Sequence, residues 1–276
     1  MEPATRTIEK QLRGLKERVG GLESALVAFS GGTDSTLLVR VARDELGERA
    51  VALTAVSPSL AREELEESRA FARAIGIRHL VLESREMENP DYVRNPEDRC
   101  YFCKSELFRL CRDEAARLGL RWVVEGSQKD DLADIRPGRR AAEELGVRSP
   151  LVEAGLGKTE VRAISRLLGL PTWDKPAMAC LASRFPTGTP ITEEGLGRVE
   201  RCERFLRERG FRLFRVRVEG RNARVELGPE ETGRLAAGPL RPEFVSVCRE
   251  NGFARVVLDL EGYRQGGREG VDAGFA

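Results

Sequence analysis

A six-residue polar loop carries the residue types of an anion-binding site. The loop follows the apolar run 25–29, a predicted buried strand, and precedes the helical pattern 36–46. Adjacent glycines let a backbone come close to a phosphate because no Cβ intervenes. The first amides of the following helix have no intrahelical partner, and hydroxyls add further donors. We therefore predict a phosphate site made of Ser30, Gly31, Gly32, Thr33, Asp34 and Ser35.

Asp34 is the acidic residue of this loop, and its carboxylate would repel a phosphate. We expect it to support the loop as a helix cap or to face a magnesium ion. A second loop, which begins at Gly126 after the predicted strand 122–125, reaches the same edge of a parallel sheet. Gly126 is therefore a second predicted contact of the bound nucleotide.

The chain has six cysteines that could do thiol or metal chemistry. Cys100 and Cys103 share one face at the start of a predicted helix, because residues three apart are neighbours on a helix. A helix N-terminus favours thiolate, so the pair fits redox or metal chemistry, although a single C-x-x-C also arises by accident. Cys180 stands among small residues with Ser183 and Arg184. The other three are predicted to fill the core: Cys111, Cys202 and Cys248.

Alternating apolar runs and amphipathic helices must position these loops. The predicted strands are 25–29, 50–56, 79–82 and 122–125, and the predicted helices are 36–46, 60–75 and 100–118. Such alternation is typical of a doubly wound parallel sheet with helices on both faces. In such sheets, ligands bind beyond the carboxyl ends of the strands. We therefore predict an α/β domain whose site lies at that edge.

The pattern changes at the turn 186–190, which contains two prolines and a glycine. Beyond it the predicted elements are a helix over 192–209, strands over 211–218 and 221–227, a helix near 241–251 and a strand over 254–260. We predict two domains, an α/β nucleotide-binding domain over residues 1–185 and a smaller α+β domain over 186–276. A cleft would open at such a boundary, so Cys180 is a candidate nucleophile.

Composition narrows the classes of function. The chain has 276 residues, and its 46 basic side chains nearly cancel its 45 acidic ones, which argues against a surface built mainly to hold nucleic acid. No run approaches the ~20 apolar residues of a membrane span, and no apolar signal segment opens the chain. We expect a cytoplasmic homo-oligomer without a stable nucleic-acid or membrane partner. In that compartment the cysteines would not form a disulfide framework.

Three segments together resemble the LarE family, the ATP-dependent sulfur transferases of nickel-pincer nucleotide cofactor synthesis. The loop 30–35 alone is similar to the SGGxDS pyrophosphate loop, or PP-loop, of the ATP pyrophosphatase superfamily. More specific are the segment 180–185, Cys-Leu-Ala-Ser-Arg-Phe, and the later segment 258–264, Leu-Asp-Leu-Glu-Gly-Tyr-Arg. The resemblance runs in order from about residue 8 to 265 and implies a fold of the PP-loop (adenine nucleotide hydrolase) type.

The family resemblance implies a reaction. ATP with magnesium adenylates a carboxylate of pyridinium-3,5-biscarboxylic acid mononucleotide, pyrophosphate leaves, and sulfur attacks to give a thiocarboxylate. Adenylation gives a poor electrophile a good leaving group, and a thiolate at Cys180 can then attack the carbonyl. In the sacrificial version of the family, this cysteine gives up its own sulfur and becomes dehydroalanine.

Some family members resemble this chain in having three cysteines that hold a 4Fe–4S cluster. Here Cys100, Cys103 and Cys180 match that set, and three thiolates would leave one iron open to carry a hydrosulfide as the transferred sulfur. We favour the cluster over sacrifice. Both versions stay open from the sequence, because spacing alone does not bring Cys103 and Cys180 together.

The resemblance also implies substrate-binding residues. Arg215 and Arg264 match the family's arginines for the mononucleotide phosphate, although Arg217 shares a strand face with Arg215. Ser183 and Arg184 are expected at the substrate, where Arg184 would hold a phosphate or carboxylate in a bidentate grip. The alternative for Arg184 is a surface salt bridge.

Two acidic residues, Glu203 and Glu226, match the family's metal cluster at the surface of the second domain. By sequence alone they are charged residues on a helix and on a strand, and such residues usually lie on solvated faces. The metal-binding and the solvated interpretation therefore stay open.

Two other functions also fit the PP-loop. The first is a related ATP pyrophosphatase, such as a tRNA thiolase or an amide-forming NAD or GMP synthetase. Even charge balance counts against a tRNA substrate, and an amide-forming enzyme would not need Cys180. The second is a nucleotide-binding regulator without catalysis, which would release no pyrophosphate.

Overall fold

The computed structural model describes residues 3–132, 137–176 and 179–263. The chain divides into two compact units: unit 1 comprises Met1–Tyr92 and Asp98–Lys175, and unit 2 comprises Val93–Glu97 and Pro176–Ala276. The last change from unit 1 to unit 2 falls between Lys175 and Pro176, earlier in the chain than residue 186. The assignment of two domains with a boundary near 186 stays a prediction.

The first half of the chain alternates strands and helices as its apolar pattern predicts. Its elements are α1 (Pro3–Gly20), β1 (Ala25–Ala28), α2 (Thr33–Leu46), β2 (Ala50–Val56), α3 (Arg62–Ile75), β3 (Arg78–Glu83), α4 (Pro90–Val93), α5 (Arg99–Leu118), β4 (Trp122–Val124), α6 (Pro137–Glu144), α7 (Pro150–Glu153) and α8 (Lys158–Leu167). Each strand and helix predicted for this half is present. Within the described ranges, no helix has the length and apolarity needed to cross a bilayer.

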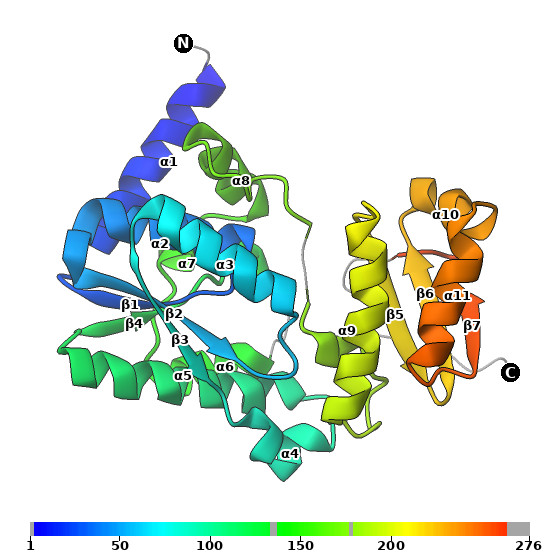
Figure 1. Ribbon diagram of the computed structural model, residues 1–276. Coiled ribbons are helices and arrows are strands. Elements are labelled where there is room, and N and C mark those ends of the chain that lie inside the picture. The colour runs from blue at the N-terminus through cyan, green and yellow to red at the C-terminus, as the bar shows by residue number, and fades with distance from the viewer. Residues whose placement is uncertain (1–2, 133–136, 177–178, 264–276) are drawn as a thin grey trace, which may run out of the picture. The chain divides into compact units, whose positions relative to one another are not determined.

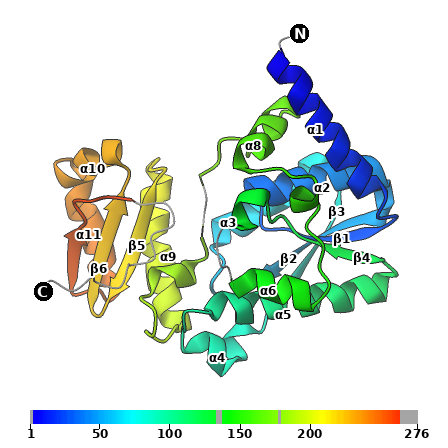
Figure 2. The same ribbon diagram turned by 180° about the vertical axis from the view of Figure 1, so that it is seen from behind.

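Unit 1 is built on a four-stranded parallel sheet of order β3-β2-β1-β4 (Figure 1). All of β1 is buried, and its successive side chains enter two different cores. Ala25 and Val27 pack with α1, α2 and α8, whereas Leu26 and Ala28 pack with α5 and α6. Figure 2 shows these helix layers on opposite faces of the sheet. The predicted doubly wound α/β architecture is confirmed.

The strand order reverses beside β1. The chain runs outward from β1 through β2 to β3 and then places β4 on the other side of β1. Such a reversal is the topological switch point at which open α/β sheets bind their ligands. The loops after β1 and after β4 leave the sheet from neighbouring strands, so they flank this point.

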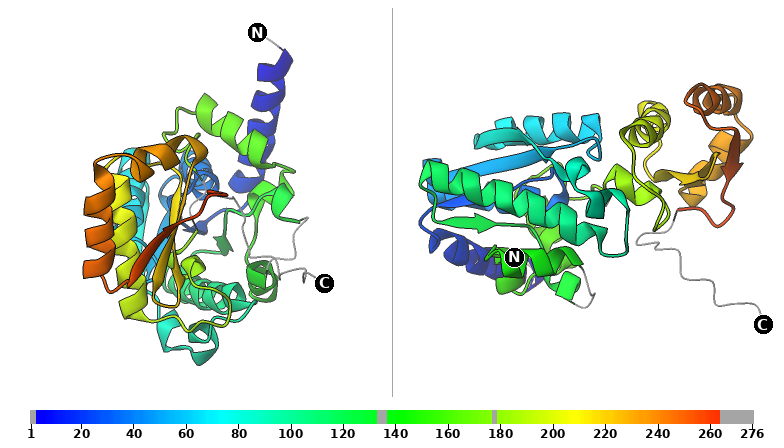
Figure 3. Two further views of the ribbon diagram at one scale, coloured as in Figure 1. Left: turned by 90° about the vertical axis from the view of Figure 1, so that its right-hand side faces the viewer. Right: turned by 90° about the horizontal axis from the view of Figure 1, so that it is seen from below.

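Unit 2 contains a smaller mixed sheet of order β5-β6-β7. Its elements are the 3-10 turn η4 (Leu181–Arg184), α9 (Glu193–Glu208), β5 (Phe214–Glu219), β6 (Asn222–Leu227), α10 (Pro229–Ala236), α11 (Leu240–Glu250) and β7 (Arg255–Leu258). β5 and β6 are antiparallel, and β6 and β7 are parallel. Figure 3 shows α9 and α11 side by side on one face of this sheet. This arrangement confirms the predicted small α+β unit.

Asn95 explains why the short segment Val93–Glu97 belongs to unit 2. Asn95 is buried in a left-handed conformation (φ 55°), which asparagine tolerates better than most residues. Its Nδ2 donates to the carbonyls of Pro186, at 2.8 Å, and Thr189, at 3.1 Å. The segment that leads into α5 is thereby attached to the loop that follows η4.

Candidate active site

The PP-loop backbone is shaped by its two glycines. Gly31 has a left-handed φ of 71°, and a Cβ at this position would lie 3.2 Å from the Cβ of Ser68 on α3. Gly32 is the N-cap of α2 and supplies no side chain to cap the first amides of the helix. Those amides therefore face the loop without a side-chain acceptor, as an anion site requires.

The loop hydroxyls also hold the loop itself. The buried Ser35 Oγ donates to the Gly32 carbonyl at 3.2 Å and accepts from the Ser30 amide at 3.3 Å. The hydroxyls of Ser30 and Ser35 lie 3.1 Å apart. Thr33 Oγ1 donates to the carbonyl of Thr172 at 2.8 Å. Ser35 thus sets the loop's curvature, and Thr33 joins the loop to a distant segment.

That distant segment, 172–175, was missed by the sequence reasoning. Lys175 Nζ donates to the Gly31 carbonyl at 3.1 Å and to Glu67 at 2.6 Å. Arg162 on α8 donates to the carbonyls of Trp173 and Lys175 at 3.0 and 2.7 Å. No local pattern marks such contacts, because they join residues far apart in the chain.

Gly126 lies directly against the start of α2. A Cβ on Gly126 would lie 3.0 Å from the Ser35 amide nitrogen and 3.2 Å from the Ser35 Cα. The preceding residue, Glu125, is buried and accepts hydrogen bonds from the hydroxyls of Ser127, at 2.8 Å, and Ser149, at 2.5 Å. The loop after β4 therefore approaches the PP-loop so closely that a side chain at position 126 would require the Ser35 backbone to move by a few tenths of an ångström.

The carboxyl group of Asp34 is electrostatically destabilised. Burial raises its pKa to about 6, and the neighbouring carboxylates of Asp131 and Glu125 add to the rise. Arg162 and Lys158 oppose the rise but do not cancel it. The protonation of Asp34 would therefore respond to a bound divalent cation and to a ligand that excludes water from the carboxyl group.

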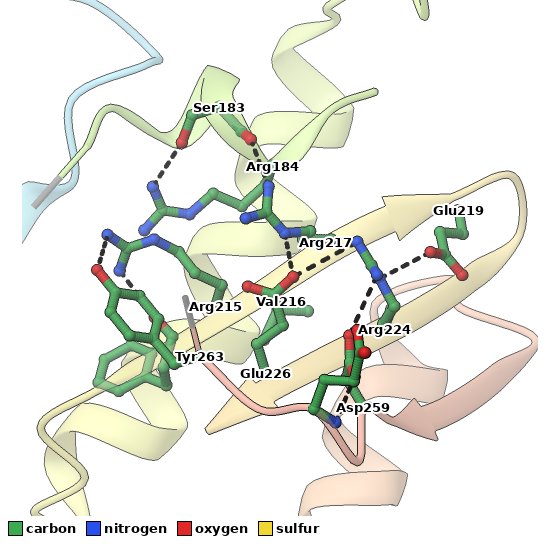
Figure 4. Close-up of polar contacts among 12 residues, drawn as sticks. Ser183, Arg184, Arg215, Val216, Arg217, Glu219, Arg224, Glu226, Asp259 and Tyr263 are labelled. Atoms are coloured by element: carbon green, nitrogen blue, oxygen red, sulfur yellow. Dashed lines mark hydrogen bonds and ion pairs between the residues drawn. The ribbon is translucent and has the colours of Figure 1, made fainter. Parts of the chain in front are cut away.

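In unit 2, the segment around Cys180 is held by the buried guanidinium of Arg184. Figure 4 shows Arg184 hydrogen-bonded to Ser183. Arg184 is 1% exposed and makes a bidentate ion pair with Glu203, which is also 1% exposed, through bonds of 2.8 and 2.7 Å. Its Nη1 donates to the carbonyls of Ala179 and Cys180 at 2.5 and 3.0 Å. The expected alternative of a surface salt bridge is wrong, because both partners are buried.

Arg215 and Arg217 extend from the same face of β5, as strand alternation predicts (Figure 4). Arg215 is 6% exposed, donates to the Tyr263 hydroxyl at 3.2 Å and lies over the Tyr263 ring. Burial and the nearby Arg184 lower the pKa of Arg215. Arg217 pairs with Glu226 and donates to the Ser183 carbonyl at 3.1 Å. Arg217 thereby contacts the segment that contains Cys180.

The solvated interpretation of Glu203 and Glu226 is wrong, because both residues are buried, at 1% and 5% exposure. Glu203 offers both oxygens to Arg184 and also accepts from the Val216 amide at 2.9 Å. Glu226 pairs through Oε1 with Arg217, whereas its buried Oε2 has no hydrogen-bond partner among the described residues. A metal ion at Glu203 would have to compete with the Arg184 ion pair.

Comparison with known proteins decides the family. No family model matches the chain. The pyridinium-3,5-bisthiocarboxylic acid mononucleotide synthase of Lactiplantibacillus plantarum is 36% identical over 247 residues, which cover 89% of this chain and 88% of that protein. The chain belongs to the LarE family.

Other relatives agree with this assignment. An uncharacterized protein of Synechocystis sp. is 52% identical to the chain over 259 residues, 94% of this chain and 97% of that protein. A GMP synthase of Chlamydia muridarum is 27% identical over 71% of this chain and 40% of its own length. As a LarE-family member the chain is an ATP-dependent sulfurtransferase, and the GMP synthase likeness reflects the shared PP-loop fold.

The six cysteines of this LarE-family chain fall into two groups. Cys100 is exposed, and Cys103 and Cys180 are half-buried, whereas the remaining three are buried. Cys100 and Cys103 occupy the first turn of α5 in unit 1, and Cys180 precedes η4 in unit 2. Within the described residues, no three metal-binding side chains form a group that could hold a metal ion. The predicted cluster ligation therefore stays a prediction.

The buried group confirms a structural role for three cysteines. Burial raises the pKa of the Cys111 thiol to about 12. A hydrogen bond with Cys202, followed by burial, raises the pKa of Cys248 far above its usual range. The thiols of Cys111 and Cys248 therefore stay protonated at neutral pH and do not compete as nucleophiles.

Arg264, the arginine of the last LarE motif, lies outside the described residues. The structure therefore describes Arg215 and Arg217 but not the second predicted phosphate arginine. Its role at the substrate stays a prediction.

A methyl group at position 126 is expected to weaken ATP binding. In Gly126→Ala the new Cβ must displace the Ser35 backbone by a few tenths of an ångström, which misaligns the first amides of α2. We expect the Kd for MgATP, measured by calorimetry, to rise about tenfold, or about 1.4 kcal/mol. Gly233→Ala is the matched control, because a Cβ there meets nothing within 4 Å. Equal Kd values for both variants would contradict the close approach.

Removing the charge of Asp34 is expected to stabilise the protein above pH 6. The pKa of Asp34 is about 6 in the folded state and 3.8 in the unfolded state. Ionisation of Asp34 therefore lowers the stability of the folded state above pH 6, and this loss of stability is absent below pH 3.8. In the presence of a chelator of divalent cations, Asp34→Asn should raise the free energy of unfolding, measured by urea denaturation, by up to about 3 kcal/mol at pH 8. Near pH 4 the gain should largely disappear.

Asp44→Asn on the same helix serves as the control, since Asp44 is half-exposed and pairs with Arg40. The free energy of unfolding of Asp44→Asn should fall by no more than about 0.5 kcal/mol at pH 8. A stability of Asp34→Asn equal to that of the unmodified protein at pH 8 would show that Asp34 carries no such electrostatic cost.

Proposed function

We propose that this chain adenylates a carboxylate of pyridinium-3,5-biscarboxylic acid mononucleotide and exchanges one of its oxygens for sulfur. The name of the L. plantarum relative gives the corresponding bisthiocarboxylic acid as its product. The observation that carries the proposal is the uncapped N-terminus of α2 at the switch point of the sheet. It supports a pyrophosphate site beside the reacting α-phosphate.

The first step consumes ATP. A carboxylate oxygen of the substrate attacks the α-phosphorus, the bond from that phosphorus to the bridging oxygen breaks, and pyrophosphate leaves. The amides of α2 and the hydroxyl of Ser30 hold the departing pyrophosphate, whose developing charge they stabilise. The product is a mixed anhydride of the carboxylate and AMP.

The second step transfers sulfur. A sulfur nucleophile attacks the carbonyl carbon of the anhydride, the carbon–oxygen bond to phosphate breaks, and AMP leaves. If the nucleophile is the Cys180 thiolate, the product is a thioester. Loss of the Cα proton of Cys180 to a base and cleavage of its Cβ–Sγ bond then yield the thiocarboxylate and dehydroalanine.

For the sulfur source we propose a 4Fe–4S cluster on Cys100, Cys103 and Cys180. The donor set fits, because these are the thiols that are not fully buried, and Cys100 and Cys103 share one helix turn. When bound, such a cluster supplies an iron with an open position that can carry an inorganic hydrosulfide. Cys180 would then act as a ligand that is not consumed.

We further propose that Mg²⁺ accompanies ATP beside Asp34. The buried carboxyl of Asp34 and its neighbours Asp131 and Glu125 concentrate negative charge that a divalent cation offsets. Mg²⁺ commonly takes one or two carboxylates and completes its shell with phosphates and water. Substrate phosphate binding by Arg215 and Arg264 and metal binding by Glu226 are proposed from the family resemblance, whereas both carboxylate oxygens of Glu203 accept hydrogen bonds from Arg184.

Cys180→Ala is expected to separate the two steps. The variant should still form AMP and pyrophosphate from ATP and the substrate, because no PP-loop contact changes, but it should yield no thiocarboxylate. Mass spectrometry of the small molecules and of the intact protein after one turnover measures both. Cys111→Ala, which removes a buried thiol, is the control and should retain sulfur transfer. Full thiocarboxylate production by Cys180→Ala would contradict a role of Cys180 in sulfur transfer.

Anaerobic purification is expected to yield an iron-containing protein with charge-transfer absorption. Both signals should be lost in Cys100→Ala and in Cys180→Ala, since each removes one of three ligands, and kept in Cys111→Ala. Iron-free protein with full single-turnover activity would contradict the cluster. Loss of one hydrogen sulfide equivalent from the protein per turnover would establish sacrifice of Cys180.

A further inference from the structure

We propose that Arg184, anchored by Glu203, positions the thiol of Cys180 and is not a ligand of the substrate. The inference rests on the proposed function, because it concerns the residue assigned there to sulfur transfer. It gives Arg184 a role different from the substrate grip that the family resemblance implies. The argument uses contacts inside unit 2 alone.

The decisive contacts join Arg184 to the two peptide groups on either side of the Cys180 Cα. The Ala179 carbonyl belongs to the peptide before that atom, and the Cys180 carbonyl belongs to the peptide after it. Arg184 Nη1 donates to both, at 2.5 and 3.0 Å. Fixing both flanking peptides fixes the backbone dihedrals of residue 180, and these set the direction of its Cα–Cβ bond.

Glu203 makes this grip rigid. Its two oxygens accept from Nε and Nη2 of Arg184, a planar bidentate geometry that allows one orientation of the guanidinium. The Val216 amide of β5 donates to the same carboxylate at 2.9 Å. The guanidinium of Arg184 and the carboxylate of Glu203 therefore connect the segment that carries the thiol to α9 and β5.

A second contact acts in the same direction. Arg217 donates from Nη1 to the Ser183 carbonyl at 3.1 Å, and Arg184 Nη1 also donates to the Ser183 hydroxyl at 3.0 Å. The segment is thus held before η4, at Ala179 and Cys180, and within η4, at Ser183. Figure 4 shows the two contacts of Ser183. Each nitrogen of the Arg184 guanidinium donates to a protein acceptor, and the side chain is 1% exposed, so a substrate anion would have to displace these bonds.

The test replaces the ion pair without leaving an unpaired buried charge. Arg184→Met/Glu203→Gln removes both charges and keeps an acceptor for the Val216 amide, because replacement of a buried ion pair by uncharged groups is often tolerated. Arg198→Met/Glu194→Gln is the matched control, since it removes an exposed ion pair from the same helix, α9. Thermal unfolding of both variants checks that they fold.

Three measurements follow on each protein. The first is the rate of AMP formation with the substrate's KM, the second is thiocarboxylate formed per AMP, and the third is the alkylation rate of Cys180 by iodoacetamide after chelation of iron. The exposed Cys100 in the same digest serves as the internal reference.

We expect AMP formation and KM to stay close to those of the unmodified protein. Thiocarboxylate per AMP should fall by up to about 100-fold, as misplacement of a reacting group by an ångström can cost. Cys180 should be alkylated faster, with the Cys100 rate unchanged.

A rise in the substrate's KM with an unchanged alkylation rate of Cys180 would overturn the proposal and assign Arg184 to the substrate. Unchanged sulfur transfer and unchanged alkylation would also overturn it. If the double variant does not fold, Glu203→Gln alone decides, because it keeps the guanidinium but loosens its anchor and should still raise Cys180 alkylation. If the unmodified protein makes no thiocarboxylate, the proposed function fails, whereas the alkylation rates still test the positioning.

Discussion

The confinement of β1 on all sides is the constraint on which the nucleotide site depends. Its edges pair with β2 and β4, where Leu26 is in register with Val51 and Val123, and its two faces pack against two helix layers. The ladder continues one residue further, because the Phe29 amide donates to Leu53 at 2.8 Å. The chain can leave this strand only at the carboxyl edge, so the PP-loop starts from a fixed point. Amides that need no rearrangement when the anion arrives are more effective in binding and in stabilising charge.

Two acidic residues at the candidate sites, Glu203 in unit 2 and Asp34 in unit 1, are stabilised to different extents. In unit 2, Glu203 is almost completely buried, and Arg184 and the Val216 amide satisfy its carboxylate. In unit 1, burial and neighbouring acids raise the pKa of Asp34 to about 6, because the nearby cations do not compensate. A paired charge holds a segment in place, whereas an uncompensated charge lowers stability and is available to a cation or a reacting group. The difference agrees with a positioning role for Glu203 and a role for Asp34 that depends on a ligand.

The apolar pattern was sufficient for most of the fold because strands and long helices bury a regular stripe. The predicted strand over 50–56 coincides with β2, and the predicted helix over 100–118 differs from α5 by one residue. Short polar helices do not bury such a stripe and were missed. Four such helices of eight residues or fewer begin with a proline, at the first helical position, where the backbone amide has no intrahelical partner: Pro90, Pro137, Pro150 and Pro229. This signal was present in the sequence and could have found them.

The candidate site was predictable where residue type alone expresses the chemistry, and not where a distant partner decides the environment. Two adjacent glycines beside hydroxyl side chains predict a phosphate-binding loop, because few other functions need that combination. Arg184 gave no sign of burial, since η4 is too short to show a periodic pattern and its partner Glu203 lies 19 positions away. With 46 basic and 45 acidic side chains, the sequence offers many pairings of equal merit. Lys175 and Gly31 are separated even further, by 144 positions. Residues that meet a ligand are therefore visible from type and spacing, whereas residues that hold those loops become visible only when the fold brings their partners together.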